Sequence, residues 1–539
     1  MILLGTSVGR QLLNAPLHCS ASQRLFSSTS FLQSKSRPKK VAEGFKDKWN
    51  YNTSPFEGKI SGEHRSFRRV TANDLENENK PPQGVKMLVR DFIEDSLYNP
   101  NYGYFPKQAT IFNTQDTTFD FQSFRDSAEF QEEVASKYAA YGASAYEGPG
   151  RQLWHTPTEL FKPWYGRAIG RCLVSEYLLK YFPYEDFVIY EIGAGNGTLA
   201  RDILDLLQQD YPEVYERTRY SIIEISESLV KLQKQKLQKL HPSVTITHQS
   251  VFRWETNEPA PCFFVAMEVI DNFAHDVVRY DMRTFKPYQG VVTVNKDGDF
   301  DTVYEPVTDP LIASFLDLRK TLNHPPPTNR LLLRSNILRN IYNAMPFAPN
   351  LSPAEYIPTR LLSLLQTLRN HFPRHRLLLS DFSSLPDTIS GVNAPVVQTR
   401  FQNITVPCST LLVKQGYFDI FFPTNFERLR DMYEYTLSQP PLDLASTMDD
   451  LAAGRISPLT STATPFALGS DYFSSYQPNN RRRPLDGVAS ASGLPIGERK
   501  SSVFSHSQFL ETYAELEKTC LRNGENAMLD FYKNVKFLF

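Results

Sequence analysis

A short segment of the sequence places an acidic residue before three closely spaced glycines. The segment reads Tyr190-Glu191-Ile192-Gly193-Ala194-Gly195-Asn196-Gly197-Thr198-Leu199. Because glycine has no Cβ, the backbone can turn sharply here and a ligand can approach it closely. A helix is expected to begin at Thr198, and its free N–H groups and positive dipole end would favour an anionic or polar ligand. The segment therefore predicts a loop that holds a nucleotide-like ligand.

The spacing of the glycines separates three kinds of nucleotide loop. A dinucleotide-binding loop has the pattern GxGxxG, but the third glycine here, Gly197, comes one residue too early. The lysine of a phosphate-binding P-loop is also missing. An S-adenosylmethionine site needs a GxGxG-type turn that an acidic residue enters, and Glu191 is that residue. The pattern therefore predicts S-adenosylmethionine as the cofactor.

Polar residues at the ends of the next two expected strands complete the predicted cofactor site. Glu224 ends the second strand, where its carboxylate can accept hydrogen bonds from both ribose hydroxyls. Gln249 and Ser250 follow the third strand, where the adenine would lie. The predicted cofactor-binding residues are Glu191, Gly193, Ala194, Gly195, Asn196, Gly197, Glu224, Gln249 and Ser250. The alternative is a tight turn that binds nothing, with Glu224 simply solvated.

Two carboxylates, Glu268 and Asp271, follow the fourth expected strand. They lie at the carboxyl end of the sheet, where open α/β folds bind their ligands. Methyl transfer is an in-line displacement that requires a well-positioned nucleophile. A guanidinium is planar and always charged, and paired carboxylates can orient it through bidentate contacts. We therefore predict that Glu268 and Asp271 are catalytic; the alternative is that both cap the start of a helix.

Alternating strands and helices are expected to position these groups. Strands are predicted at 187–190, 220–224, 244–248 and 262–267, with helices at 198–209 and 228–240. This order predicts an α/β fold of the Rossmann-like class I methyltransferase type, with a mostly parallel central sheet.

A helical N-terminal segment is expected to precede this core. Helices and a β-ribbon are expected as insertions within it. The predicted helices are 86–98, 128–141, 309–322, 329–344, 353–371 and 507–522. The predicted strands are a β-ribbon at 277–304, a buried strand at 376–381, and a closing hairpin formed by 404–413 and 417–422.

Shifts in composition divide the chain into segments. Residues 1–42 contain no Asp or Glu but several Arg, Lys and Ser residues, which is typical of a mitochondrial transit peptide. The segment rich in Ser, Pro, Gly and Arg near the C-terminus is predicted to be a disordered loop. The expected segments are the transit peptide at 1–42, a polar linker at 43–84, a helical cap or substrate region at 85–185, the methyltransferase core at 186–439 with an insertion at about 277–372, the disordered loop at 440–505, and a C-terminal helix and tail at 506–539.

Composition and charge narrow the classes of protein further. The net charge of −1 gives no nucleic-acid footprint, and no apolar run is long enough to predict a transmembrane segment. None of the five cysteines forms a CxxC pair, so we expect neither a disulfide framework nor a bound metal. With the basic leader, these features predict a protein of the mitochondrial matrix.

Several separated segments of the chain together resemble the MidA family of methyltransferases. They are residues 92–104, the segment 156–160 followed by Gly166 and Gly170, and residues 190–204, 223–226, 266–272 and 378–382. The resemblance runs from about 85 to 440 with insertions. It implies a mitochondrial protein arginine methyltransferase that forms symmetric dimethylarginine. It also implies that the substrate is a respiratory complex I subunit and that the protein assists complex I assembly.

The sequence departs from the family pattern beside the expected acceptor pocket. The family has Asn-Glu-Phe-x-Asp after the fourth strand, whereas this chain has Met267 and Val269 in place of the asparagine and the phenylalanine. Glu268 and Asp271 remain. Two other functions therefore stay open: a non-catalytic assembly factor with the methyltransferase fold, and a methyltransferase whose acceptor is a small molecule or RNA.

Overall fold

The computed structural model describes residues 66–107, 109–111, 118–143, 152–154, 156–329, 331–332, 335–345, 348–401, 404–437 and 501–539. The expected transit peptide, residues 43–65 of the expected linker and residues 440–500 of the expected disordered loop lie outside these ranges. No helix in the described ranges is both long enough and apolar enough to cross a membrane.

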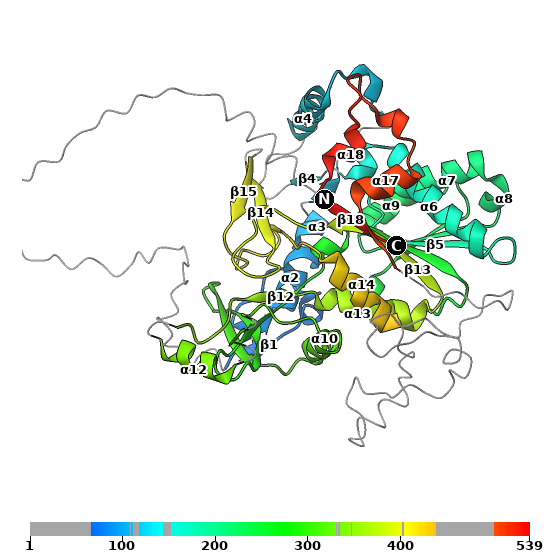
Figure 1. Ribbon diagram of the computed structural model, residues 1–539. Coiled ribbons are helices and arrows are strands. Elements are labelled where there is room, and N and C mark those ends of the chain that lie inside the picture. The colour runs from blue at the N-terminus through cyan, green and yellow to red at the C-terminus, as the bar shows by residue number, and fades with distance from the viewer. Residues whose placement is uncertain are drawn as a thin grey trace, which may run out of the picture.

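A seven-stranded sheet forms the centre of the molecule (Figure 1). Its strand order is β17-β18-β13-β8-β5-β6-β7. The bounds are β5 Phe187–Ile192, β6 Thr218–Glu224, β7 Val244–His248, β8 Cys262–Met267, β13 His375–Phe382, β17 Val503–Ser505 and β18 Val535–Leu538. Neighbouring strands from β7 to β13 pair in parallel, whereas β18 is antiparallel to both of its neighbours. Five of these strands were predicted, four as the first strands of the core and β13 as the buried strand at 376–381.

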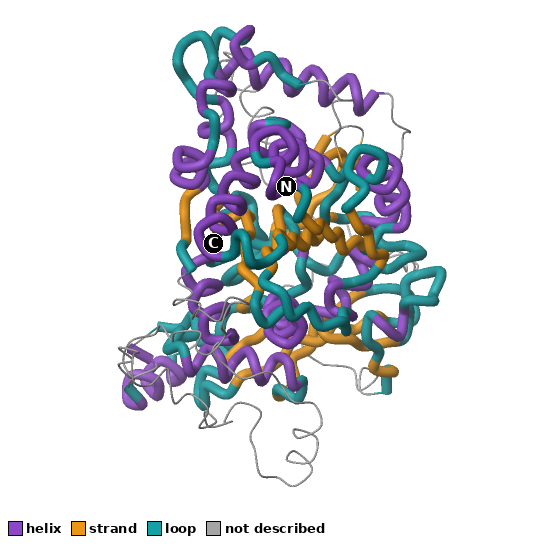
Figure 2. Tube along the Cα trace, turned by 90° about the vertical axis from the view of Figure 1, so that its right-hand side faces the viewer, coloured by secondary structure: helices purple, strands orange, loops and turns teal. Residues whose placement is uncertain are grey.

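Helices cover both faces of this sheet, as the views in Figures 1 and 2 show. Ile189 and Phe263 pack in one core with α6 (Trp164–Lys180) and α7 (Thr198–Asp210). Their neighbours Val188 and Phe264 pack in a second core with α13 (Thr359–His371) and α14 (Phe426–Leu437). Because both faces are covered, the strands carry continuous apolar runs rather than an alternating pattern. The α/β class is thus confirmed.

A second sheet contains six strands in the order β1-β2-β10-β9-β12, with β11 paired to β10. Its bounds are β1 Arg68–Arg69, β2 Val85–Leu88, β9 Asp276–Tyr280, β10 Pro287–Val294, β11 Phe300–Pro306 and β12 Glu355–Ile357. The predicted β-ribbon forms β9, β10 and β11. Apart from the β1–β2 pair, these strands pair antiparallel, so the sheets of the molecule as a whole are mixed.

The remaining elements lie around these two sheets. The helices are α2 Val89–Tyr98, α3 Tyr104–Lys107, α4 Ser127–Ala143, α5 Pro157–Leu160, α8 Pro212–Tyr215, α9 Glu227–Leu237, α10 Pro310–Thr321, α12 Asn336–Ala344, α17 His506–Tyr513 and α18 Ala527–Phe531. The strands are β3 Ala109–Ile111, β4 Gln152–Trp154, β14 Val396–Phe401, β15 Ile404–Cys408 and β16 Asp419–Phe421.

Several predictions made near the chain ends were wrong. The linker was predicted to extend to residue 84, but it contains the strand β1, which pairs with β2 just after it. The disordered loop was predicted to extend to 505 and the last residues to be a tail, but β17 and β18 are strands of the central sheet. Such strands are stabilised by partners far away in the sequence, so their short local patterns do not reveal them.

Several element predictions also need correction. The helix predicted at 86–98 begins only at Val89, because residues 85–88 form the strand β2. The helix predicted at 353–371 begins with the strand β12 and becomes helical only after Pro358, whose fixed φ suits a helix start. The hairpin predicted from 404–413 and 417–422 does not form, because β15 and β16 each pair with β14 instead. The helix predicted at 507–522 ends at Tyr513, and a short 3-10 helix, Leu516–Thr519, follows it.

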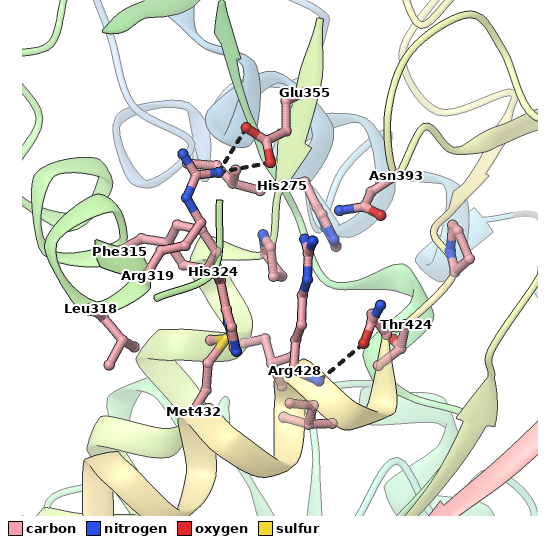
Figure 3. A pocket seen from close by; sticks show the side chains of 16 residues that line it. His275, Phe315, Leu318, Arg319, His324, Glu355, Asn393, Thr424, Arg428 and Met432 are labelled. Carbon is pink, nitrogen blue, oxygen red and sulfur yellow. Dashed lines mark hydrogen bonds and ion pairs between the residues drawn. The ribbon is translucent and has the colours of Figure 1, made fainter. Parts of the chain in front are cut away.

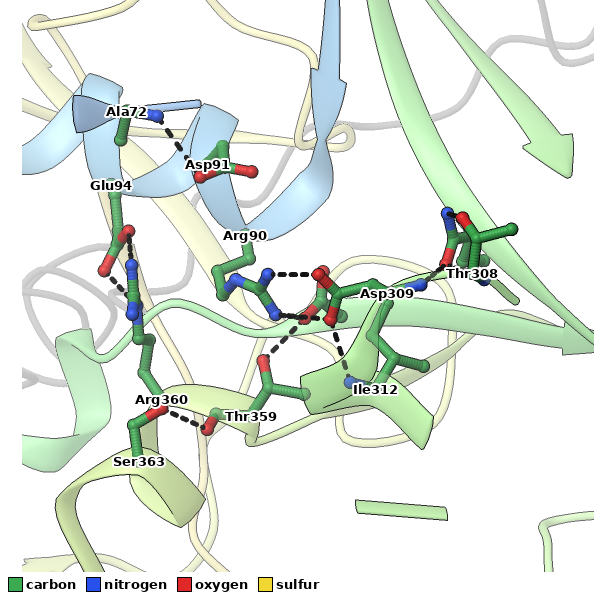
Figure 4. Close-up of polar contacts among 12 residues, drawn as sticks. Ala72, Arg90, Asp91, Glu94, Thr308, Asp309, Ile312, Thr359, Arg360 and Ser363 are labelled. Carbon is green, nitrogen blue, oxygen red and sulfur yellow. Dashed lines mark hydrogen bonds and ion pairs between the residues drawn. The ribbon is translucent and has the colours of Figure 1, made fainter. Parts of the chain in front are cut away.

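A buried arginine fastens the second sheet to the helices beside it (Figure 4). The Arg90 guanidinium of α2 pairs with Asp276 of β9 at 2.6 Å and with Asp309, the N-cap of α10, at 2.9 Å. The Thr359 hydroxyl of α13 donates to Asp276 at 2.7 Å. A charged group this deeply buried needs such partners, since an unpaired one would oppose folding by several kcal/mol.

Two glycines let α6 and α7 approach each other closely. A Cβ built on Gly166 would lie 2.4 Å from the Cβ of Asp202, and one on Gly170 would lie 2.7 Å from Leu206 Cδ2. The first contact is with an atom fixed to the α7 backbone, so a side-chain rotation cannot relieve it. The glycines therefore allow α6 to pack closely on α7, the helix that begins at the glycine turn.

We predict that Gly166→Ala lowers the free energy of unfolding by about 1–3 kcal/mol, the usual cost of overpacking. Urea titration should show the loss. Ser175→Ala, on the exposed face of the same helix, should change it by less than about 0.5 kcal/mol. A Gly166→Ala protein that is more stable than the wild type, as helix propensity alone would make it, would contradict the close contact.

Candidate functional site

The glycine turn between β5 and α7 has a backbone that ordinary residues rarely adopt. Gly193, Gly195 and Gly197 have φ values of 67°, 55° and 77°. A Cβ on Gly193 would lie 2.6 Å from Val269 Cγ2, and one on Gly197 would lie 2.9 Å from Leu237 Cδ1. Both backbone conformation and space therefore require glycine at these positions. Because these glycines have no side chains, a ligand could approach the backbone of the turn closely.

A buried carboxylate that sequence reasoning did not assign to the site braces this turn. Glu159 of α5 accepts hydrogen bonds from Asn196 Nδ2 at 3.0 Å and from Thr198 Oγ1 at 2.6 Å. Lys162 Nζ lies 3.5 Å from its other oxygen. The residue belongs to the segment 156–160 on which the family resemblance partly rests. Nothing in the local pattern, however, reveals a contact with residues nearly 40 positions later.

Glu191, at the end of β5, is fully enclosed between neighbouring strands. It accepts a hydrogen bond from the Tyr220 hydroxyl of β6 at 2.8 Å. Burial raises the pKa of Glu191 to about 8, and the nearby charge of Glu224 adds to the shift. The carboxyl group therefore holds its proton near neutral pH unless a cation comes close to it.

Glu224, at the end of β6, is tied to the glycine turn by one amide group. Its Oε1 accepts from the backbone N–H of Ser226 at 2.9 Å, and its Oε2 accepts from Gln233 Nε2 at 3.2 Å. The same Nε2 donates to the carbonyl of Gly195 at 2.8 Å. A carboxylate has about four lone-pair positions. Contacts with Ser226, Gln233 and the Ile225 backbone use some of them, and the predicted contact with the ribose hydroxyls needs the others.

Gln233 is a second residue that sequence reasoning missed. It is completely buried on α9, between Val230 and Leu237 on the apolar side of that helix. Its Oε1 has no hydrogen-bond partner among the described residues. An amide on the apolar face of an amphipathic helix was the available signal, because a polar group there needs a partner from elsewhere.

Gln249 and Ser250 lie beside Glu224 at the carboxyl end of the sheet. The backbone N–H of Gln249 donates to the Glu224 carbonyl at 3.0 Å. The two side chains support a local turn: Gln249 Nε2 donates to the Arg253 carbonyl, and Ser250 Oγ accepts from the Phe252 N–H. Their predicted contact with adenine stays a prediction.

Four carboxyl groups lie together near the carboxyl ends of β8 and β13 and the start of β16. We call Glu268, Asp271, Asp381 and Asp419 the acidic cluster. Asp381 Oδ2 accepts from the backbone N–H groups of Ile270 and Asp271 at 3.0 and 3.1 Å. Asp419 Oδ1 accepts from Asn272 Nδ2 at 3.2 Å. The cluster joins residues from three separate parts of the chain.

Asp271 and Glu268 are the least conventional members of the acidic cluster. Asp271 is completely buried, and neither of its carboxylate oxygens has a hydrogen-bond partner among the described residues. It does not cap the short 3-10 helix Ile270–Asn272, whose N-cap is Val269, so the capping alternative fails for this residue. Glu268 has a φ of 54°, a strained conformation for a residue with a side chain.

The electrostatics of the acidic cluster favour a bound cation. Burial raises the pKa of Asp271 to about 7, and the charges of Asp419 and Glu268 add to the shift. Burial also raises the pKa of Glu268, Asp381 and Asp419. Within the described ranges, no Lys or Arg side chain pairs with Asp271, Asp381 or Asp419. A bound cation would lower these raised pKa values and favour the charged carboxylates.

Tyrosines border the acidic cluster, and the glycine turn adjoins it. The Tyr98 hydroxyl donates to the Asn272 carbonyl at 3.1 Å. Burial and the charge of Glu268 raise the pKa of Tyr165 and of Tyr532. Val269, the residue after Glu268, is the one that fills the space beside Gly193. The expected acceptor side and cofactor side of the site are therefore in contact.

Two cavities of the described structure lie away from the glycine turn. One, of about 50 Å³, is lined by His275, Arg319, Glu355 and Arg428 among others (Figure 3). The other, of about 170 Å³, lies between β9, β11 and the loop that contains Leu411. Neither touches a predicted site residue, so the candidate site rests on the contacts described above.

Comparison with known proteins supports the cofactor prediction. Residues 168–441 match the Methyltransf_28 family model, described as "Putative S-adenosyl-L-methionine-dependent methyltransferase". This range covers the predicted cofactor and acceptor residues and confirms the resemblance to the MidA family. A Schizosaccharomyces pombe protein named "Protein arginine methyltransferase NDUFAF7 homolog, mitochondrial" is 25% identical over 58% of this chain and 67% of its own length.

A Saccharomyces cerevisiae protein with the same name is 22% identical over 50% of this chain and 65% of its own length. The chain thus spans less than two thirds of the length of this relative. Among solved structures, one of a "likely methyl transferase" from Burkholderia thailandensis bound to S-adenosyl-homocysteine is 13% identical. The alignment covers 71% of this chain and 83% of that one, with a TM-score of 0.39.

We predict that Glu224→Gln weakens binding of S-adenosyl-homocysteine by roughly 10- to 100-fold, because hydrogen bonds to a charged group are strong. Gln233→Leu should weaken it in the same direction, since it removes the amide that holds Glu224 while keeping a similar volume. Titration calorimetry measures both.

Gln235→Leu, at an exposed position of α9, is the matched control and should bind like the wild type. Unchanged affinity in Glu224→Gln would remove Glu224 from the cofactor site. Unchanged affinity in Gln233→Leu alone would remove only the positioning role of the amide.

Proposed function

The chain belongs to the S-adenosyl-L-methionine-dependent methyltransferase family whose model spans residues 168–441, and we propose that it is a mitochondrial protein arginine methyltransferase. S-adenosyl-L-methionine is the cofactor of this family. The names of the two fungal relatives support both the arginine acceptor and the mitochondrial location. The further proposals are the matrix as compartment, symmetric dimethylarginine as product, and a complex I subunit as substrate, with a role in complex I assembly.

The acidic cluster is the observation that carries this proposal. A guanidinium is a planar, permanently charged group with five N–H donors. Asp271 offers two buried oxygens that have no hydrogen-bond partner among the described residues, and Glu268 lies three residues before it. A neutral acceptor would bring no charge to Asp271, whereas a guanidinium would bring both a positive charge and N–H donors for its lone pairs.

Each part of the proposed site has one task in the reaction. The cofactor supplies a methyl group on a sulfonium, and the glycine turn with Glu224 holds its adenosyl part. Glu268 and Asp271 would hold and orient the guanidinium so that one of its nitrogens can accept the methyl group that the bound cofactor would supply. A carboxylate of the acidic cluster would accept the proton that this nitrogen loses.

The substitution at Met267 favours one competing function. Met267 ends β8 as a nearly buried side chain, where the family has an asparagine. An amide could hold an acceptor group by hydrogen bonds, whereas a thioether cannot do so well. A non-catalytic assembly factor that kept the cofactor site is therefore the second candidate. A methyltransferase with a small-molecule or RNA acceptor is the third candidate. An assay of labelled methyl transfer separates the three.

We predict that the full chain transfers labelled methyl groups from S-adenosylmethionine to arginine in a protein of a mitochondrial extract. The double variant Glu268→Gln, Asp271→Asn should lose at least about 100-fold in rate, as expected when groups that position a charged substrate are removed. Its affinity for S-adenosyl-homocysteine should stay unchanged.

Cofactor binding without transfer by the wild type would favour the assembly factor. Label in RNA or in small molecules would redirect the acceptor assignment. Equal turnover of the double variant and the wild type would remove both carboxylates from the mechanism.

We also predict that an arginine peptide releases protons when it binds. Burial raises the pKa of Asp271 to about 7, and a nearby guanidinium lowers the pKa of a carboxyl. Protons held at neutral pH must therefore leave as the peptide binds. Calorimetry of the S-adenosyl-homocysteine complex in buffers with different ionisation enthalpies measures this release.

Asp271→Asn should reduce the number of protons released, since an amide does not titrate. A citrulline peptide, which is neutral, is the matched ligand control and should release none. Binding of the arginine peptide without proton release would contradict a guanidinium in the acidic cluster.

A further inference from the structure

The helix α12 exposes its apolar side chains to solvent. Ile337 and Ile341 are 73% and 53% exposed, and Leu338 and Met345 are also exposed. Residues 337, 341 and 345 are spaced four apart, so they form one stripe along the helix. None of the residues from Asn336 to Ala344 is buried. A helix that packs on its own protein would normally bury this stripe.

The polar side of α12 holds it to the body of the protein. The Arg339 guanidinium lies 4.6 Å from the centre of the Phe285 ring and contacts the Arg283 carbonyl at 3.5 Å. Asn343 Nδ2 donates to the Met282 carbonyl at 3.2 Å. These contacts lie on the turn between β9 and β10. The helix is therefore attached by its polar residues, and its apolar stripe points outward.

The position of α12 leaves this stripe remote from the proposed methyl-transfer site. Figure 1 shows the helix at the outer edge of the second sheet, far from α7 and the central sheet. The stripe is thus a separate surface, and its function does not depend on the proposed methyl transfer.

Charge indicates what could cover the apolar stripe. The sequence from Leu318 to Ala354 contains no Asp or Glu, and it includes Lys320, Arg330, Arg334 and Arg339. Lys320 is exposed, and so are Arg283 and Lys286 on the adjoining β9–β10 turn, which also carries Asp281. An apolar stripe on a helix whose own sequence region is basic and contains no acid is typical of helices that lie in the interface of an anionic membrane.

Area argues against a protein partner. A stable protein interface buries about 800 Å² on each side, which is more than one helix of fewer than three turns presents. A lipid surface makes no such demand, because each apolar side chain can insert separately. We propose that α12 docks the protein on an anionic lipid surface by inserting Ile337, Leu338, Ile341 and Met345 below the headgroups.

Vesicle co-sedimentation of the full chain tests this proposal. The wild type should bind vesicles of phosphatidylcholine mixed with cardiolipin, bind vesicles of phosphatidylcholine alone more weakly, and lose affinity as salt rises. The double variant Ile337→Asp, Ile341→Asp should bind the anionic vesicles at least about tenfold more weakly. Leu179→Asp, at a position of α6 that is 82% exposed, is the matched control and should bind like the wild type.

Equal binding by the double variant and the wild type, or no binding by either, would overturn the proposal. Two further measurements exclude other occupants of the stripe. Light scattering should show the same mass for both proteins, since a dimer that only the wild type forms would make a second copy the occupant. Their melting temperatures should also agree, because a lower value in the variant would mean that the chain itself covers the stripe.

Discussion

The glycine turn between β5 and α7 depends on three residues that have no side chain, Gly193, Gly195 and Gly197. Val269 fills the space beside Gly193, and Leu237 fills the space beside Gly197. Glu159 of α5 accepts hydrogen bonds from Asn196 and Thr198 of the turn. The surrounding elements thus fix a strained backbone that would otherwise have many alternatives. The position of Val269 also brings the end of β8 against the turn, so the two halves of the site are built on one contact.

The acidic cluster, next to the glycine turn, makes the folded state less stable as pH rises. Its carboxyls are buried, and they hold protons more tightly in the folded chain than in the unfolded one. For a raised carboxyl pKa, the folded state is favoured most below the ordinary value and loses stability as pH rises towards the raised value. For Asp271 this range lies between 3.8 and about 7. A bound guanidinium would reverse this loss of stability. Binding of a cationic acceptor would therefore be favoured over binding of a neutral one.

The parts of the site that the sequence predicted are those carried by local pattern. The apolar runs of β5, β6 and β8 and the glycines after β5 mark the carboxyl edge of the sheet, and Glu224 lies on it. Gln233, Glu159 and Asp381 escaped prediction because each acts through a contact with a distant part of the chain. Asp381, for example, receives the N–H groups of residues about 110 positions earlier. Such contacts depend on strand order, which no single segment specifies.

The central claim is that a glycine turn for the adenosyl group and an acidic cluster for a guanidinium form one site. A crystal structure with S-adenosyl-homocysteine and an arginine peptide tests it most directly. The account predicts the ribose at Glu224 and the guanidinium within hydrogen-bond distance, about 3 Å, of Glu268 and Asp271. A peptide bound elsewhere, or a cluster that keeps its carboxyls turned away from the guanidinium, would contradict the account.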